Sequence, residues 1–153
     1  MNKTLLVSGW LNYTHSICMV NLEHLKCFID SGIKVFTNER APLFANWIDS
    51  SKKSSLSSDK YYQRCLAGTT NAISFADYDG LIDIAVPPCL PSFQAKKKAV
   101  FMVSETDTLS DSYLHVSGGL DNLQYIHNNC DFIFTPSEWS RQSLINTGLT
   151  RNK

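Results

Sequence analysis

The sequence lacks most of the features that would assign a protein to a specialised class. Its 153 residues carry no charge excess, because 14 lysines and arginines balance 14 aspartates and glutamates. Dedicated nucleic-acid binders usually carry a basic excess, so this balance argues against nucleic acid as a partner. No apolar run approaches the roughly 18–20 residues that span a membrane. With 43% hydrophobic residues, the composition predicts a single folded domain over 1–153 rather than a disordered segment.

Motifs for metal binding are equally scarce. The cysteines are Cys18, Cys27, Cys65, Cys89 and Cys130. They form no CxxC pair and no zinc-ligand spacing with histidine, so we expect no metal site. An odd, scattered set favours reduced structural thiols over redox or catalytic ones, and a cytoplasmic protein. The opening segment 1–9 is too short for the apolar core of a signal peptide, which leads to the same expectation.

The first 37 residues predict a strand, a helix and a second strand. Leu5-Leu6-Val7 is a short apolar run closed by Ser8-Gly9, as expected for a buried strand. From about 16 to 31 the apolar period becomes helical, with Cys18, Leu22, Leu25 and Ile29 on one face. Gly32 follows as a helix cap, and residues 33–37 form the next strand. Such a βαβ unit makes a parallel sheet.

The same alternation continues along the chain. We expect strands at 81–86, 99–103 and 131–135, and helices at 61–72, 119–129 and 137–147. In the helix at 119–129, Leu120, Leu123 and either Ile126 or His127 should face inward. The chain is therefore expected to be an α/β protein, with a Rossmann-like, doubly wound, mostly parallel sheet and helices on both faces.

Ligands of such sheets bind beyond the carboxyl ends of the strands, and the first of these loops runs from Gly9 to Ser16. A strand that leads into a helix can present backbone N–H groups to a phosphate. The loop lacks both GxGxxG and GxxxxGK[ST], so its phosphate signal is a single glycine. Taken alone, Gly9 is better explained as a tight turn than as a phosphate contact, and His15 as a structural loop or helix-cap residue than as a catalytic one.

Two later loops carry polar groups that suit a site. Glu105 and Asp107 follow the strand at 99–103, where paired carboxylates bind sugar hydroxyls or act as acid and base. They also fit the capping of a turn. Ser137 precedes a helix, with Glu138 in its first turn, so helix capping explains this pair as well as a site does.

Three stretches of the chain resemble a known family in their exact residues, which are more specific than a strand or a helix at those positions requires. Residues 101–107 read FMVSETD, residues 129–140 read NCDFIFTPSEWS, and residues 147–149 read TGL. In this order they resemble the amino-terminal half of GT-B glycosyltransferases, in the large retaining family called group 1 or family 4. Ser16, Asn21 and the GIKV stretch at 32–35 resemble that family's first helix and second strand.

The resemblance implies sugar transfer from a nucleotide-sugar donor to an acceptor, between two Rossmann-like halves. The amino-terminal half shapes the acceptor side, and its first loop approaches the sugar and phosphates of the donor. By this resemblance, the residues that would approach the sugar and phosphates of the donor are Gly9, Asn12 and Ser16. The polar groups implied to face the cleft are Glu105, Asp107 and Ser137. The nucleotide-sugar is a co-substrate, and the family implies no metal and no cofactor.

The chain departs from the family in two respects. The glycine-rich first loop is reduced to Gly9, and the donor-binding half is missing. That half usually carries two glutamates eight positions apart, whereas the four glutamates of this chain include no such pair. Residues 40–95 match no part of the family. We therefore expect an acceptor-side domain that is inactive until a donor-binding domain or subunit complements it.

The sequence is compatible with three hypotheses about function. The chain is a truncated product, an excised fragment or one subunit of a split glycosyltransferase. Alternatively, it is a binding or assembly module without catalysis, in which a homodimer would bury the cleft face. The third reading is a small nucleotide-binding protein that acts alone, and the missing phosphate loops count against it.

Overall fold

The computed structural model describes residues 3–11, 16–41, 60–74, 76–104 and 106–149. The described strands are β1 (Thr4–Gly9), β2 (Lys34–Glu39), β3 (Thr69–Asn71), β4 (Gly80–Ile84), β5 (Lys98–Phe101) and β6 (Phe132–Phe134). The described helices are α1 (Ser16–Asp30), α3 (Lys60–Ala67), α4 (Asp111–Val116), α5 (Gly119–Asn129) and α6 (Glu138–Asn146).

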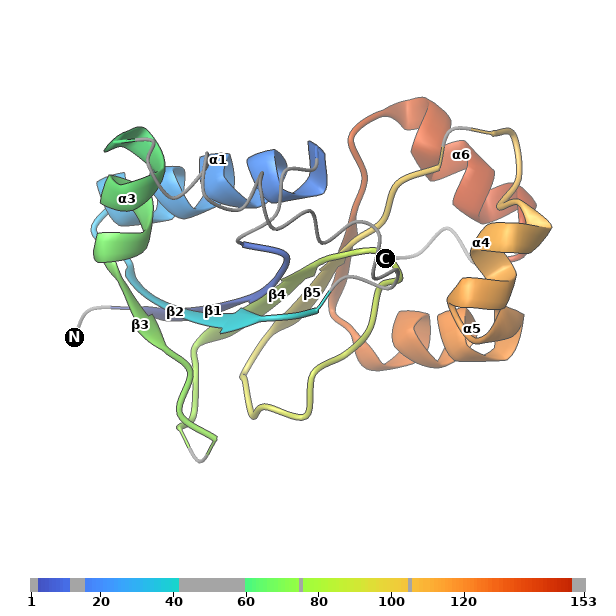
Figure 1. Cartoon of the computed structure of the whole chain (residues 1–153). Coiled ribbons are helices and arrows are strands. Elements are labelled where there is room, and N and C mark those ends of the chain that lie inside the picture. The colour runs from blue at the N-terminus through green and yellow to red at the C-terminus, as the bar shows by residue number, and fades with distance from the viewer. Residues whose placement is uncertain (1–2, 12–15, 42–59, 75, 105, 150–153) are drawn as a thin grey trace.

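The strands form one open sheet in the order β3-β2-β1-β4-β5-β6 (Figure 1). Every neighbouring pair in this sheet is parallel. Strands β2 and β3 are therefore added on one side of β1. The chain then crosses to the other side of β1, where β4, β5 and β6 follow in order. This is the order of the doubly wound Rossmann arrangement, which places a ligand crevice where the direction reverses. The α/β, Rossmann-like fold class predicted from the sequence is confirmed.

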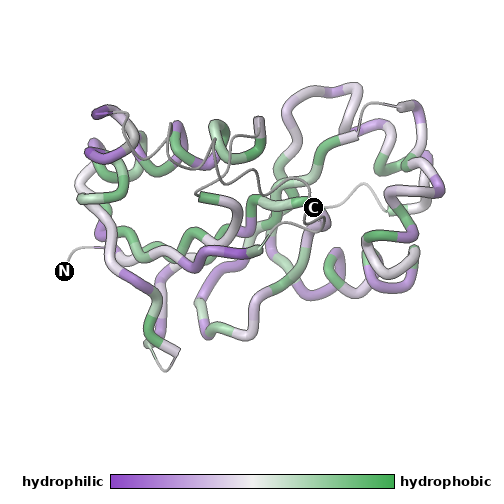
Figure 2. The backbone as a smooth tube through the Cα atoms, in the orientation of Figure 1, coloured by the Kyte–Doolittle hydropathy of each residue, from purple (hydrophilic) through white to green (hydrophobic). Residues whose placement is uncertain are grey.

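Helices cover both faces of the sheet, as a parallel sheet requires (Figure 1). α1 buries Cys18, Leu22 and Leu25 in a core that includes Val7 and Ile82 of the central strands. Along α1 the backbone of Figure 2 alternates between hydrophobic and hydrophilic, as a helix with one buried face should. On the other face, a second core joins the β5 end of the sheet to α5 and α6; its members include Val100, Leu123, Ile126 and Leu144.

Two local expectations are wrong, and one helix was not predicted. The helix expected over 61–72 ends at Ala67, and β3 follows at once after Gly68. A side chain at Gly68 would lie 2.9 Å from Ile29 Cδ1, so glycine lets the end of α3 approach α1 closely. Helix α4 was not expected, because its six residues are too few to show a period. Leu120 is 42% exposed, since α5 turns both Ile126 and His127 inward instead.

Gly9 ends β1, where it pairs with Ile84 of β4. A Cβ atom on Gly9 would lie 2.1 Å from the carbonyl oxygen of Ile84 and 2.7 Å from Asn21 Nδ2. Its φ of 155° is also one that side chains rarely adopt. The sequence reading of Gly9 as a turn residue therefore understates its role, because only glycine allows β1 to pair with β4 there.

We expect Gly9→Ala to lower the free energy of unfolding by more than about 2 kcal/mol, because backbone atoms of β4 must move to admit the methyl group. Urea denaturation monitored by circular dichroism measures the change. Gly80→Ala is the matched control at the other end of β4, since its nearest neighbour is the flexible Leu5 Cδ1 at 3.0 Å. Equal losses in the two variants would contradict this account of Gly9.

Candidate functional site

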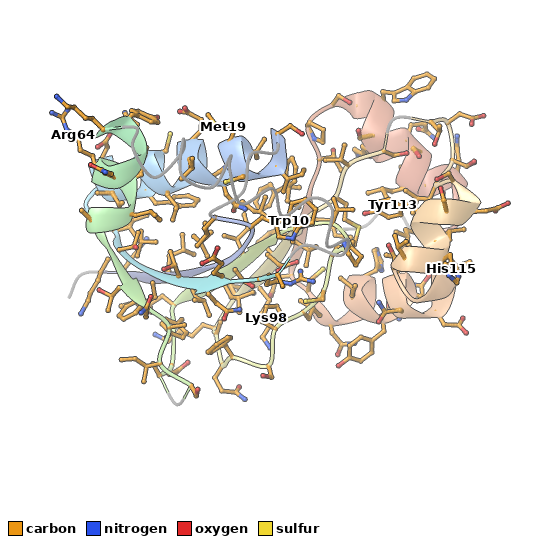
Figure 3. The ribbon with its side chains drawn as sticks, viewed as in Figure 1. Trp10, Met19, Arg64, Lys98, Tyr113 and His115 are labelled. Carbon is orange, nitrogen blue, oxygen red and sulfur yellow. The ribbon has the colours of Figure 1, made fainter. Side chains whose placement is uncertain are left out.

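The carboxyl ends of β1 and β4 are joined by a side chain from α1. Asn21 is fully buried, and its Nδ2 donates to the carbonyl of Trp10 at 2.9 Å and to that of Ile84 at 2.8 Å. Both carbonyls lie where the strands separate, so no neighbouring strand can pair with them. The Asn21 side-chain amide therefore holds two backbone carbonyls together at the entrance of the expected crevice. Trp10 sits at this end of the sheet, beneath α1 (Figure 3).

A row of polar side chains crosses the sheet one position before the strand ends. The register places Asn38 of β2, Ser8 of β1 and Asp83 of β4 beside one another on one face. Asn38 Nδ2 donates to Ser8 Oγ at 3.1 Å. The Asp83 carboxylate is fully buried and accepts from Arg40 Nη1 at 3.0 and 2.9 Å. A charged pair therefore lies inside the carboxyl end of the sheet.

Arg40 and Asp83 also hold the segment that follows β4. Arg40 Nη2 donates to the carbonyl of Pro87 at 3.1 Å, and the Cys89 amide donates to Asp83 Oδ2 at 3.0 Å. The Arg40 amide itself donates to the carbonyl of Gly9 at 2.8 Å. Arg40 therefore links the ends of β1, β2 and β4, through its backbone amide to Gly9 and through its ion pair with the buried Asp83.

The electrostatics of this cluster follow from its burial. Desolvation raises the pKa of Asp83, and the Arg40 charge and the Cys89 amide oppose this rise. Desolvation and the nearby Asp83 charge raise the pKa of Cys89 to about 11. The thiol is therefore protonated at neutral pH, which excludes Cys89 as a ready nucleophile. Burial likewise raises the pKa of Tyr113, which points from α4 toward the sheet (Figure 3).

The structure places the described members of the predicted site at one edge of the sheet. Gly9 ends β1, and Ser16 begins α1 with an exposed side chain. Asp107 is exposed in the segment after β5. Ser137 follows β6 and caps α6, where its Oγ accepts from the Ser140 amide at 3.1 Å. These positions all follow the carboxyl ends of parallel strands. Asn12 and Glu105 lie outside the described residues.

Sequence reasoning missed Asn21, Arg40 and Asp83 as organisers of this edge. Asp83 had a visible signal, because it is the lone charge within the apolar run Leu81–Val86. A carboxylate in a buried strand requires a partner, which is a cation or hydrogen-bond donors. Nothing in the sequence identifies that partner as Arg40, which lies 43 residues away. Asn21 belongs to the stretch that resembles the family, but its two contacts depend on the fold.

A surface groove of about 250 Å³ lies elsewhere, between α1 and α3. The hydroxyl of Tyr61, one of its lining residues, donates to Glu23 Oε1 at 2.9 Å. Its lining residues are Lys26, Ile29, Asp30, Tyr61, Arg64 and Cys65. Arg64 extends from α3 into solvent on the same side as Met19 of α1 (Figure 3). None of the predicted site residues lines this groove.

The described part of the chain contains neither a cluster of metal ligands nor a membrane-spanning helix. Across the described ranges, no three histidine, cysteine or acidic side chains lie close enough to share a metal ion. Nor does that part of the chain contain a helix with the length and apolarity to cross a membrane. None of the five cysteines, all of which lie in the described ranges, forms a disulfide bond. Comparison with protein-family models, curated proteins and solved structures returns no match to this chain.

We expect Arg40→Met to lower the free energy of unfolding by about 3–5 kcal/mol near pH 8, because it leaves a buried carboxylate without its counter-charge. The pKa of Asp83 then rises further above its unfolded value of 3.8. Because the folded state then binds the proton more tightly than the unfolded state, the protein loses stability as the pH rises from the unfolded pKa of Asp83 to its folded pKa. The deficit should therefore shrink as the pH falls toward 4, which denaturation at several pH values measures.

The double variant Arg40→Met with Asp83→Asn supplies the control, because it carries no buried charge. Its stability should change less with pH between about 4 and 8 than that of Arg40→Met. If the two variants showed the same pH dependence, Asp83 would not be the group that Arg40 neutralises.

Proposed function

We propose that the chain is the acceptor-side half of a GT-B glycosyltransferase, which transfers a sugar from a nucleotide-sugar once a donor-binding half is present. One observation supports this most. The segments that resemble the family are separate in sequence, yet those after β1, β5 and β6 all follow strand ends at the same edge of the sheet. This is the edge at which doubly wound sheets bind their ligands.

The chemistry of the described residues at this edge suits a sugar acceptor. Asp107 presents an exposed carboxylate beyond β5, and carboxylates accept hydrogen bonds from sugar hydroxyls. Ser16 stands at the first turn of α1, where helix N–H groups attract the phosphates of a donor. Arg40 does not add a free cation for phosphate, because it is paired with Asp83. The donor phosphates would therefore depend on the first turn of α1 and on a donor-binding half.

A second candidate is an assembly module without catalysis, and the outer strand favours it. Phe132 and Phe134 of β6 are each 49% exposed, with ring centroids 6.3 Å apart. Trp139, in the first turn of α6, is 60% exposed. Exposed aromatic groups of this kind are common where proteins associate. A homodimer that buries β6 would support this candidate over the first.

We expect the isolated chain to transfer no sugar from nucleotide-sugars, and transfer to appear when a donor-binding half of a related enzyme is fused to it or added. Asp107→Asn should then lower the transfer rate at least about tenfold, because it removes the charged acceptor. Radiolabelled sugar incorporation measures both effects.

Asp77→Asn is the matched control, since Asp77 is exposed just before β4, at the opposite edge of the sheet. It should leave the rate unchanged. Sugar transfer by the chain alone, or equal losses in the two variants, would contradict the proposed role of this edge.

A further inference from the structure

A polar face of α6 runs along the segment that links β5 to α4. The residues of this face are Ser140, Ser143, Asn146 and Thr147, the last of which caps the helix. Their spacing of three and four places them along one side of a helix. Ser140 and Ser143 are almost fully buried, at 2% and 1% exposure. Hydroxyl groups at that depth need hydrogen-bond partners, and the segment 104–109 supplies them.

The first part of the segment is held at Ser104. Ser140 Oγ donates to the Ser104 carbonyl at 2.8 Å, and Ser143 Oγ donates to Ser104 Oγ at 2.7 Å. Ser104 Oγ in turn donates to the carbonyl of Thr106 at 3.1 Å. A chain of hydrogen bonds therefore runs from Ser143 of α6 through Ser104 Oγ to the Thr106 carbonyl, and it stabilises the turn after β5.

The second part is held one helical turn further along. Asn146 Nδ2 donates to the carbonyl of Asp107 at 3.0 Å. The Leu109 amide donates to Thr147 Oγ1 at 2.8 Å, and Thr147 Oγ1 donates to the Ser143 carbonyl. Residues 104, 107 and 109 therefore meet α6 in order along its length. Backbone groups of Ser104, Asp107 and Leu109 are thus paired with side chains of the helix.

We propose that α6 is the positioning element of the site, and that Ser143 and Thr147 set the conformation in which the segment after β5 presents Asp107. This inference rests on the proposed function only for the use of Asp107. The coupling between helix and segment stands on the hydrogen bonds alone. The two stretches SETD and PSEWS, separated by some thirty residues in the sequence, are on this account one structural unit.

The test removes one hydroxyl and keeps the shape of its side chain. In the full chain, Thr147→Val should speed amide hydrogen exchange of Leu109 by about tenfold, because the acceptor Oγ1 is lost. Thr147→Ser retains the hydroxyl and should restore slow exchange. Arg141→Ala, on the exposed side of α6, should leave Leu109 unchanged. The backbone chemical shift of Asp107 should move in Thr147→Val and not in the other two.

Two results would overturn the proposal. One is unchanged exchange at Leu109 in Thr147→Val. The other is faster exchange spread evenly over the sheet, which would show a general loss of stability rather than a local release. Sugar transfer by the complemented enzyme distinguishes the two proposals. A local release with no transfer in any variant, wild type included, would leave α6 as the positioning element and refute the glycosyltransferase.

Discussion

The pairing of β1 with β4 at their carboxyl ends is the constraint on which the rest of the structure depends. It requires glycine at position 9, because the carbonyl of Ile84 occupies the space of a side chain. It also requires Asn21, since the carbonyls of Trp10 and Ile84 lose their strand partners as β1 and β4 separate. The strand order reverses at this point, so every loop that leaves the carboxyl edge is positioned relative to it.

Two polar systems extend this arrangement to the loops on either side. Arg40 and Asp83 hold the ends of β2 and β4 through an ion pair whose carboxylate is buried. The cost of its desolvation is offset by Arg40, by the Cys89 amide and by Ser8. On the other side, the hydroxyl groups of α6 hold the segment after β5. The first system uses charge and the second uses neutral groups. Both give fixed positions to segments that have no strand beside them, as loops that carry function require.

The sequence predicted the parts of the fold that depend on local periodicity. α1 and the strands on either side of it follow from the spacing of Cys18, Leu22 and Leu25, and from Gly32 as a cap. The short elements α4 and β3 escaped prediction, because a few residues show no period and their stability comes from packing. Among the predicted site residues, Gly9 ends β1, and Asp107 and Ser137 lie in the segments after β5 and β6; their roles stay predictions. Arg40, Asn21 and the partners of Ser104 were not predicted, since contacts across 36–63 residues depend on topology.

The central claim is that the carboxyl edge of the sheet is where this chain meets its ligands. The most direct test is to titrate the isotopically labelled full chain with millimolar glucose, a simple sugar that carries the hydroxyl groups of an acceptor, and to follow its backbone amides by NMR. The account predicts saturable shifts that gather at residues following β1, β5 and β6, such as Leu11, Thr106 and Ser137. Shifts confined to the groove between α1 and α3, or the absence of any saturable shift, would contradict it.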